Sequence, residues 1–258
     1  MSVISLQNVS KVYSVTPQIE LRRLLRHLVD EVRRRKSDDG DSNRRALKNV
    51  NLEIEAGESL GIIGRNGSGK TTLLRLLAGV TLPTTGRVRV EGEVSSLIGL
   101  GVGFHGDLTG RENLYLYCSL MGMRTAQIRA RLDEIADFAD LGDYIDVAFK
   151  RYSAGMMARL GFAAALHVEP GILLLDEVLA VGDHQFHVKS MEALRKVMNR
   201  CTLVFVSHSM ESVTEICRRA IWLDQGTLRA DGPAADVCAE YLAAQEAEMA
   251  SRAEAVAR

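Results

Sequence analysis

The chain has 258 residues, of which 47% are hydrophobic and 25% are charged, the balance of an ordinary globular protein. Its formal net charge of −1 argues against a nucleic-acid partner, and no apolar run approaches the roughly 18 residues that indicate a membrane-spanning helix. Met1 leads directly into a strand-like segment, so we expect no signal peptide. Four widely spaced cysteines are expected to be reduced thiols in a cytosolic protein: Cys118, Cys201, Cys217 and Cys238.

Alternation of apolar and polar side chains over residues 3–9 predicts a half-buried strand. Tyr13 follows this strand, and its ring either packs in the core or stacks on the face of an adenine. Residues 46–63 predict two further strands, separated by a turn at Ala56 and Gly57.

The segment before residue 46 is unusually basic, because the first 50 residues hold 11 Lys and Arg against 6 Asp and Glu. Helical spacing of Leu and Val over residues 19–36 predicts an amphipathic helix, with seven basic residues on its other faces and at its end. Two interpretations remain open. The helix either lies near anionic lipid headgroups or a membrane partner, or it is a surface helix with a solvated basic face. Residues 37–45 are polar and predict a loop.

Residues 64–71 match G-x-x-x-x-G-K-[ST], the phosphate-binding loop, between a predicted strand over 58–63 and a predicted helix over 72–78. Glycines let the backbone turn and bring its N–H groups to phosphate oxygens, and the helix dipole adds positive potential. The lysine of the motif reaches the β- and γ-phosphates, and the following hydroxyl ligates Mg²⁺. The candidate nucleotide-binding residues here are Gly64, Arg65, Asn66, Gly67, Ser68, Gly69, Lys70, Thr71 and Thr72.

Beyond the loop, residues 81–86 predict a turn, and residues 87–91 and 94–100 predict strands. Helical spacing dominates between about residues 107 and 168, where one helix carries Leu114, Leu116 and Leu120 and another carries an apolar face from Ile128 to Ala139. A helical insert of this size inside an α/β chain indicates a subdomain.

An apolar run over residues 172–175 ends at Asp176, as in a strand buried on both faces. Ligands of open α/β sheets gather at the carboxyl ends of strands, so we expect Asp176 beside the phosphate loop, holding Mg²⁺ directly or through water. Glu177 is then placed to polarise the attacking water. His208 ends the next predicted strand, over 202–207, and either caps a helix start or contacts the γ-phosphate.

The C-terminal part predicts a helix over 183–199, a helix over 210–218 and a hairpin turning at Gln225 and Gly226. Pro233 fits the first turn of a helix over 234–244. Residues 245–258 are expected to form a tail that is either a fraying helix or disordered.

Together these motifs resemble the ATPase subunits of ATP-binding cassette (ABC) transporters along nearly the whole chain. The resemblance implies an α/β P-loop NTPase core with an N-terminal antiparallel β region and an inserted helical subdomain. This domain spans residues 1–244, with a basic insert at about 15–45 and helices at about 107–168. The resemblance also implies ATP and Mg²⁺ as cofactors and favours adenine stacking for Tyr13. Its catalytic and metal residues map onto Lys70, Glu177 and His208, and onto Thr71 and Asp176.

The signature segment of that family usually reads L-S-G-G-Q, and here Ser153 and Gly155 match it, whereas Ala154 and Met156 depart. In the family this segment starts a helix and closes on the ATP of the other subunit, so the resemblance implies a head-to-tail homodimer with two-fold symmetry. Ser153 is expected to be the helix N-cap, and Asp183 matches the D-loop, which in the family lies at the interface between the two copies. Most relatives place a Gln near the metal, but residues 94–114 contain none.

Residues 99–105 (GLGVGFH) and 108–113 (LTGREN), together with the basic insert, resemble the ATPase subunits of exporters for O-antigen, capsule and teichoic-acid polymers. This branch implies a peripheral ATPase on the cytoplasmic face of the inner membrane, which drives export of a lipid-linked polysaccharide through a separate integral membrane permease. The alternative cargo is teichoic acid, another glycolipid or a small molecule.

A soluble ABC ATPase that clamps DNA or ribosomes is the alternative of another class, but it usually needs long coiled coils or two cassettes, and this sequence has neither. Some relatives of the export branch add a C-terminal β-sandwich that binds the polymer end. Only 16 residues follow Leu242 here, so we expect another chain or the membrane permease to recognise polymer ends.

Overall fold

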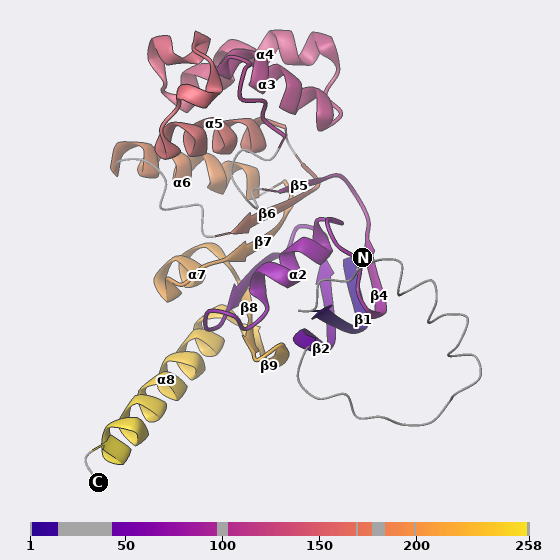
Figure 1. Ribbon diagram of the computed structural model, residues 1–258, viewed down its shortest axis with the longest axis vertical. Helices are drawn as coiled ribbons and strands as arrows, with labels where there is room; N and C mark the ends of the chain where they lie inside the picture. The colour runs from indigo at the N-terminus through magenta and orange to yellow at the C-terminus, as the bar shows by residue number, and fades with distance from the viewer. Residues whose placement is uncertain are drawn as a thin grey trace, which may run out of the picture.

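The computed structural model describes residues 2–14, 43–96, 103–168, 170–176, 184–198 and 200–256. Within these ranges the chain forms two sheets and a group of helices that projects from one end of the larger sheet (Figure 1). The predicted basic helix over 19–36 lies outside the described residues.

The N-terminal sheet is antiparallel, with strand order β2-β1-β4. Its strands are β1 (Ser2–Ser14), β2 (Asn43–Glu55) and β4 (Thr85–Val90). β1 continues well past the predicted end at Val9. The register shifts around Asn8, whose φ is 50°, so the alternation of apolar and polar residues stops there although the strand does not. β2 likewise begins before residue 46, so the prediction of a loop up to residue 45 was wrong at its end. Because both strands are longer than predicted, Tyr13 of β1 pairs with Arg44 of β2 across the sheet.

The larger sheet has the order β5-β6-β7-β3-β8-β9. Neighbouring strands from β5 to β8 are parallel, and β9 is antiparallel to β8. The hairpin between β8 and β9 turns at Gln225 (φ 48°) and Gly226 (φ 83°), as predicted, because two consecutive positive φ angles match the twist of the strands. The bounds are β3 (Ser59–Ile63), β5 (Val94–Ser96), β6 (Ile172–Asp176), β7 (Thr202–Val206), β8 (Arg219–Asp224) and β9 (Thr227–Pro233).

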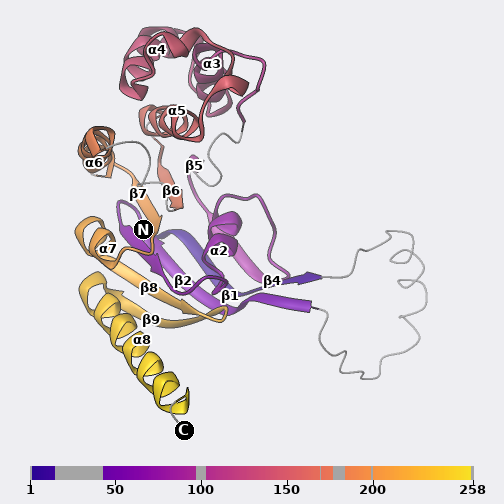
Figure 2. The same ribbon diagram turned by 60° about the vertical axis from the view of Figure 1, so that its left-hand side comes forward.

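Both faces of this larger sheet are covered. On one face, α2 (Lys70–Leu77) packs between the sheet and the antiparallel strands, and Leu174 of β6 is buried there. On the other face lie α6 (His184–Met198), α7 (Met210–Ile216) and α8 (Ala234–Val256), as Figure 2 shows for α7 and α8. Leu173 and Leu175 of β6 are buried on that side. Burial on both faces explains why β6 reads as a continuous apolar run.

The projecting helices have a core of their own. They are α3 (Gly110–Leu120), α4 (Thr125–Ala139) and α5 (Ala154–His167), with two short 3₁₀ helices, η1 (Gly142–Asp146) and η2 (Phe149–Arg151), before α5. Leu114 is fully buried, whereas Leu120, at the end of the same helix, is 61% exposed. α5 belongs to two cores, because Leu160 packs with α3 and α4 whereas Phe162 packs with α6.

Two C-terminal helices differ in length from their predictions. α7 ends at Ile216 rather than at residue 218, because Cys217 is extended and β8 begins at Arg219. α8 continues to Val256 as one helix, so the described part of the tail is helical rather than disordered. Its Ala- and Glu-rich sequence has high helix propensity. Contacts along its length also hold it, since Gln245 Nε2 donates to Tyr241 Oη at 2.6 Å.

The four cysteines are buried free thiols, which agrees with the prediction that they are reduced. In the described part of the chain, no helix has both the length and the apolar character needed to cross a bilayer.

Candidate nucleotide-binding site

The loop over residues 64–69 joins β3 to α2, as the motif predicts, and it is packed too tightly for side chains at two of its glycines. Gly64 has φ 147°, and a Cβ there would lie 2.2 Å from the carbonyl oxygen of Leu223 on β8. Gly69 has φ 113°, and a Cβ there would lie 2.5 Å from the carbonyl oxygen of Ala46 on β2. Any larger residue would push the loop away from the two strands that shape it.

Lys70, the first residue of α2, folds back into this loop. Its Nζ donates hydrogen bonds to the carbonyl oxygens of Gly64 (2.8 Å) and Arg65 (3.2 Å), and the residue is only 6% exposed. Burial lowers the pKa of Lys70, and the nearby carboxylate of Asp176 opposes that shift. The ammonium group therefore lies at the centre of the loop, beside the positive end of the α2 dipole, where an anion is favoured.

Asp176 stands at the carboxyl end of β6 and faces the start of α2. Burial raises the pKa of Asp176, whereas Lys70, Arg75, His208 and a hydrogen bond from the Thr71 hydroxyl all act to lower it. The raised pKa means that burial outweighs these partners. A carboxylate and a hydroxyl in contact beside a lysine form a donor set of hard oxygens, the ligand type that Mg²⁺ prefers.

The loop, the strand ends and the antiparallel sheet enclose a cavity of about 470 Å³. His208 follows the end of β7, and its pKa is lowered by burial and by Lys70, against the opposing effect of Asp176. Tyr13 also lines the cavity and is 36% exposed, with Lys11 Nζ 5.1 Å from the centroid of its ring. The structure thus gathers nine of the proposed site residues around one cavity: Tyr13, Asn66, Gly67, Gly69, Lys70, Thr71, Thr72, Asp176 and His208.

Comparison with known proteins agrees with this geometry. The model of the family described as ABC transporter matches residues 47–180, which include the loop and β6. The chain belongs to this family. It is 46% identical over 197 residues to an O-antigen export system ATP-binding protein, RfbB, of Klebsiella pneumoniae, covering 76% of this chain and 80% of that one. It is 44% identical over 199 residues to the teichoic acids export ATP-binding protein TagH of Enterococcus faecalis.

The curated relatives differ in length. The chain covers 45% of the RfbB protein of Myxococcus xanthus, to which it is 46% identical, and 44% of TagH from Enterococcus faecalis. The relatives named for O-antigen export and those named for teichoic acids export both confirm the resemblance to the ATPase subunits of polymer exporters that the motifs indicated.

Solved structures confirm the fold. A dimeric bacterial ABC transporter cassette superposes with a TM-score of 0.70 at 25% identity, covering 90% of this chain and 98% of that one. A structure of an ATP-binding subunit of an ABC transporter gives a TM-score of 0.74 at 18% identity, covering 93% of each chain. The α/β cassette with its antiparallel region and helical insert is therefore the fold of this ABC protein.

The signature segment lies away from this cavity, on α5, and both views separate α5 from α2 (Figures 1 and 2). Ser153 is the N-cap of α5, as predicted, because its hydroxyl accepts a hydrogen bond from Met156 N at 3.2 Å. Ser153, Ala154 and Gly155 are exposed and Met156 is half-buried. The first turn of α5 thus presents its free N–H groups to solvent rather than to the cavity of its own chain.

Residues 108–113, the segment typical of the polymer-export branch, form the start of α3 and support the signature segment. Thr109 and Glu112 form a capping box at the start of this helix. Asn113 is fully buried and ties together the backbone of residues 105–109. Gly110 leaves space for Tyr152, since a Cβ there would lie 2.1 Å from its hydroxyl oxygen. Tyr152 immediately precedes Ser153, so the two motifs pack against each other.

Three residues of the phosphate-loop motif do not line the cavity. The carbonyl of Gly64 binds Lys70, and the side chain of Arg65 turns to the other side of the loop, where its Nη1 lies 2.6 Å from Oε2 of Glu248 on α8. Ser68 is buried, and its carbonyl accepts a hydrogen bond from Gly226 N at 2.9 Å. Arg65 and Ser68 line a second cleft of about 680 Å³ between the loop and α8.

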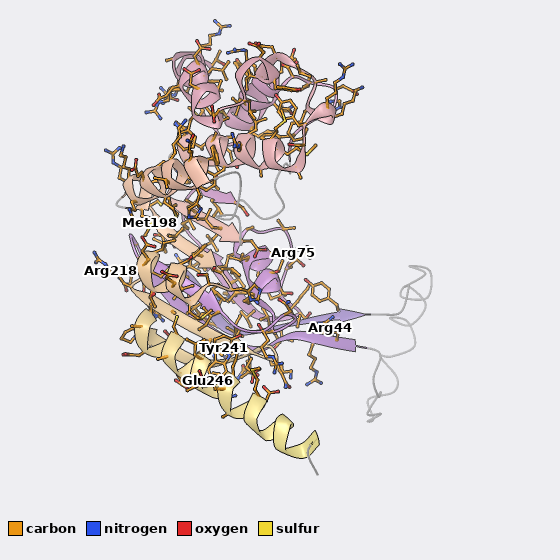
Figure 3. The ribbon with its side chains drawn as sticks, turned by 90° about the vertical axis from the view of Figure 1, so that its left-hand side faces the viewer. Arg44, Arg75, Met198, Arg218, Tyr241 and Glu246 are labelled. Carbon is orange, nitrogen blue, oxygen red and sulfur yellow. The ribbon has the colours of Figure 1, made fainter. Side chains whose placement is uncertain are left out.

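Sequence reasoning missed three residues that line the cavity: Arg44, Ala46 and Arg75. Arg75 lies one turn beyond Thr71 on α2, so helical spacing from the loop could have found it. Arg44 and Ala46 carry no motif, and they reach the site only through the pairing of β2 with β1. Figure 3 labels Arg44 and Arg75.

Several proposed residues and segments lie outside the described residues. They are Glu177, Asp183, the basic segment over 19–36, and residues 99–102 of the export-type motif. Glu177 directly follows Asp176, the last residue of β6, in the sequence.

Proposed function

We propose that this protein is the ATP-hydrolysing subunit of an ABC exporter that moves a lipid-linked surface polysaccharide, of the O-antigen or capsule type, across the cytoplasmic membrane. The observation that carries this proposal is the cavity that joins Lys70, Thr71, Asp176 and His208 in a chain 46% identical to O-antigen export ATP-binding proteins. The electrostatics agree, because the described lining of the cavity carries three Lys and Arg side chains against one carboxylate and so favours a polyanionic ligand.

Within this site each residue has a distinct task. Tyr13 stacks on the adenine, and the N–H groups of the loop and the start of α2 bind the phosphates. Lys70 exchanges its bonds to the loop carbonyls for the β- and γ-phosphates. His208, at the end of β7, contacts the γ-phosphate. Burial and Lys70 lower the pKa of its ring in the nucleotide-free site, which favours the neutral form there, and a ring N–H can donate a hydrogen bond to the phosphate.

The donor set fits Mg²⁺. The Thr71 hydroxyl and the Asp176 carboxylate are already in contact, and together they would hold the metal that accompanies ATP. Bound there, Mg²⁺ would neutralise charge on the phosphates. Glu177, which directly follows Asp176 in the sequence, orients and deprotonates the attacking water.

The complete site requires a second copy of the chain. The first turn of α5 is capped by Ser153 and exposed, yet it does not line the cavity of its own chain. In a head-to-tail homodimer each α5 supplies these N–H groups to the γ-phosphate held by the other copy, and Asp183 lies at the same interface. ATP binding then closes the dimer, and hydrolysis reopens it.

Closure and reopening of this dimer drive an integral membrane permease, to which the chain binds at the cytoplasmic face of the inner membrane. The lipid-linked polymer passes through the permease rather than through this protein. Teichoic acid is the alternative cargo, since relatives with that name are 44% identical. Chemical analysis of the polymer that accumulates inside cells lacking this protein distinguishes the two.

The experiment that tests the function is affinity purification of the protein from native membranes in mild detergent, with Lys70→Ala as the inactive control. We expect a protein with several membrane-spanning helices to co-purify with both versions at one-to-one stoichiometry, and only the unmodified version to hydrolyse ATP. Recovery of a soluble homodimer with ribosomal or DNA-associated proteins instead would overturn the transporter assignment.

A further inference from the structure

Arg44 is a cation of the cavity wall that the catalytic mechanism leaves unused. It lies on β2 and lines the same cavity as Lys70 and Asp176. Lys70 is already held by two loop carbonyls. The side chain of Arg44, in contrast, makes no hydrogen bond or ion pair with the described part of the chain, and the residue is exposed. A guanidinium group carries five N–H donors, and none of those of Arg44 has an acceptor among the described residues.

Two contacts fix where Arg44 lies. Across the β1–β2 pair it stands directly opposite Tyr13, so the two side chains are neighbours on the sheet. At its far end, Nη2 lies 2.9 Å from the position that a Cβ on Gly67 would occupy. The side chain therefore extends from beside the aromatic ring to the backbone of the phosphate loop, between the proposed sites for the base and for the phosphates.

We propose that Arg44 binds the phosphate chain of the nucleotide, and that it adds selectivity for nucleoside polyphosphates over uncharged nucleosides. This inference rests on the proposed function of the site as an ATP site. The guanidinium matches phosphate oxygens with two parallel hydrogen bonds, a geometry that a lysine cannot reproduce. The backbone at position 67 has φ 80°, which favours glycine, and the absence of a side chain there also leaves room for the guanidinium beside the loop.

The neighbouring residue offers a matched control. Arg45 lies on the same strand, is also exposed and has the same charge, but it pairs with Val12 and does not line the cavity. Successive residues of a strand point to opposite faces. Removing Arg45 therefore changes the net charge of the protein as much as removing Arg44 does, without touching the cavity.

The test measures equilibrium binding of ATP, ADP and adenosine to the purified full-length protein, for Arg44→Ala, Arg44→Lys, Arg45→Ala and Lys70→Ala. We expect Arg44→Ala to weaken ATP and ADP binding about 5- to 20-fold, at or below the lower end of the range for a charge-assisted hydrogen bond, because the side chain is exposed. Adenosine binding should be unchanged. Arg44→Lys should recover part of the loss, and Arg45→Ala should match the unmodified protein.

The outcomes separate the two proposals. If Lys70→Ala abolishes ATP binding while Arg44→Ala behaves like Arg45→Ala, the role of Arg44 is overturned and the ATP site stands. Equal weakening of ATP and adenosine by Arg44→Ala would also overturn it, because the residue would then shape the pocket rather than bind phosphate. If the unmodified protein binds no ATP, both proposals fail. Thermal unfolding of each variant serves as the control for the fold, and we expect the substitutions at the exposed Arg44 and Arg45 to leave the thermal midpoint unchanged.

Discussion

Asn113 holds the start of the helical group in place, and its replacement by alanine should be far more destabilising than the loss of an ordinary asparagine. Its Nδ2 lies at hydrogen-bond distance from the carbonyl oxygens of His105 (3.0 Å), Leu108 (3.2 Å) and Thr109 (2.9 Å), so its two N–H donors are shared among three acceptors. Its Oδ1 accepts a hydrogen bond from His105 N at 2.6 Å. The side chain is fully buried.

The magnitude follows from what each partner keeps after the substitution. All three carbonyls retain a backbone donor: Leu108 N for His105, Phe149 N for Leu108, and Asn113 N for Thr109. Losing those bonds is therefore a modest effect, but His105 N is left without its acceptor and a small void replaces the amide. The sum is about 2–4 kcal/mol in the free energy of unfolding.

Urea denaturation of Asn113→Ala measures this loss, with Asn51→Ala as the control. Asn51 Oδ1 also accepts a backbone hydrogen bond, from Asn8 N at 2.8 Å, but that pair is exposed. Water replaces an exposed partner, so we expect a loss of about 1 kcal/mol or less there. If Asn113→Ala lowers the free energy of unfolding no more than Asn51→Ala does, the hydrogen bonds of the Asn113 side chain do not hold residues 105–109 and the reasoning is refuted.

Four further outcomes are expected. Glu177→Gln should bind ATP, hydrolyse it about 100-fold or more slowly and accumulate a closed dimer on size exclusion, and near-normal turnover would rule out its role as the base. Asp176→Asn should raise the thermal midpoint of the nucleotide-free protein at pH 7. The pKa of Asp176 is raised in the folded state, so the ionised carboxylate destabilises the native state above that pKa, and this effect lessens as the pH falls. A lowered midpoint at pH 7 would contradict this. Gly110→Ala should lower the free energy of unfolding by about 1–3 kcal/mol, and adding Tyr152→Phe should recover part of this loss by removing the clashing hydroxyl. If the losses of the two single variants simply add in the urea titration of the double variant, the contact is not responsible. Burial raises the pKa of Cys217 to about 12, so its alkylation at pH 8 should be slow until urea unfolds the protein; rapid labelling of the native protein would show that the thiol is accessible.

Local signals in the sequence predict much of this fold. Strands with apolar runs, the turn at Gln225 and Gly226, and the capped start of α5 are each determined within a few residues, and the structure has them as predicted. The predictions fail where a tertiary contact decides. β1 continues past an irregularity at Asn8 because β2 and β4 pair with it, which periodicity does not reveal.

Some residues of the candidate site can likewise be predicted from local sequence, whereas others are placed only by a tertiary contact. The phosphate loop is one contiguous motif, and Asp176 and His208 follow from the rule that ligands gather at the carboxyl ends of parallel strands. Arg44 belongs to a segment that the sequence presents as a polar loop. Only the register of β2 against β1, which brings residue 44 opposite residue 13, places it in the cavity. No local pattern encodes such a pairing.

The packing of α5 explains how the signature segment keeps its position relative to the nucleotide cavity. Ser153 and Gly155 are exposed at the start of the helix, but its later turns are buried on two sides. Leu160 packs among α3 and α4, and Phe162 packs against α6 and the larger sheet. A helix anchored in both cores cannot rotate about its axis without opening one of them, because protein interiors are close-packed. The exposed end of α5 is therefore carried as a rigid extension of both cores, so in the proposed homodimer the second copy would meet a preformed surface rather than a flexible one.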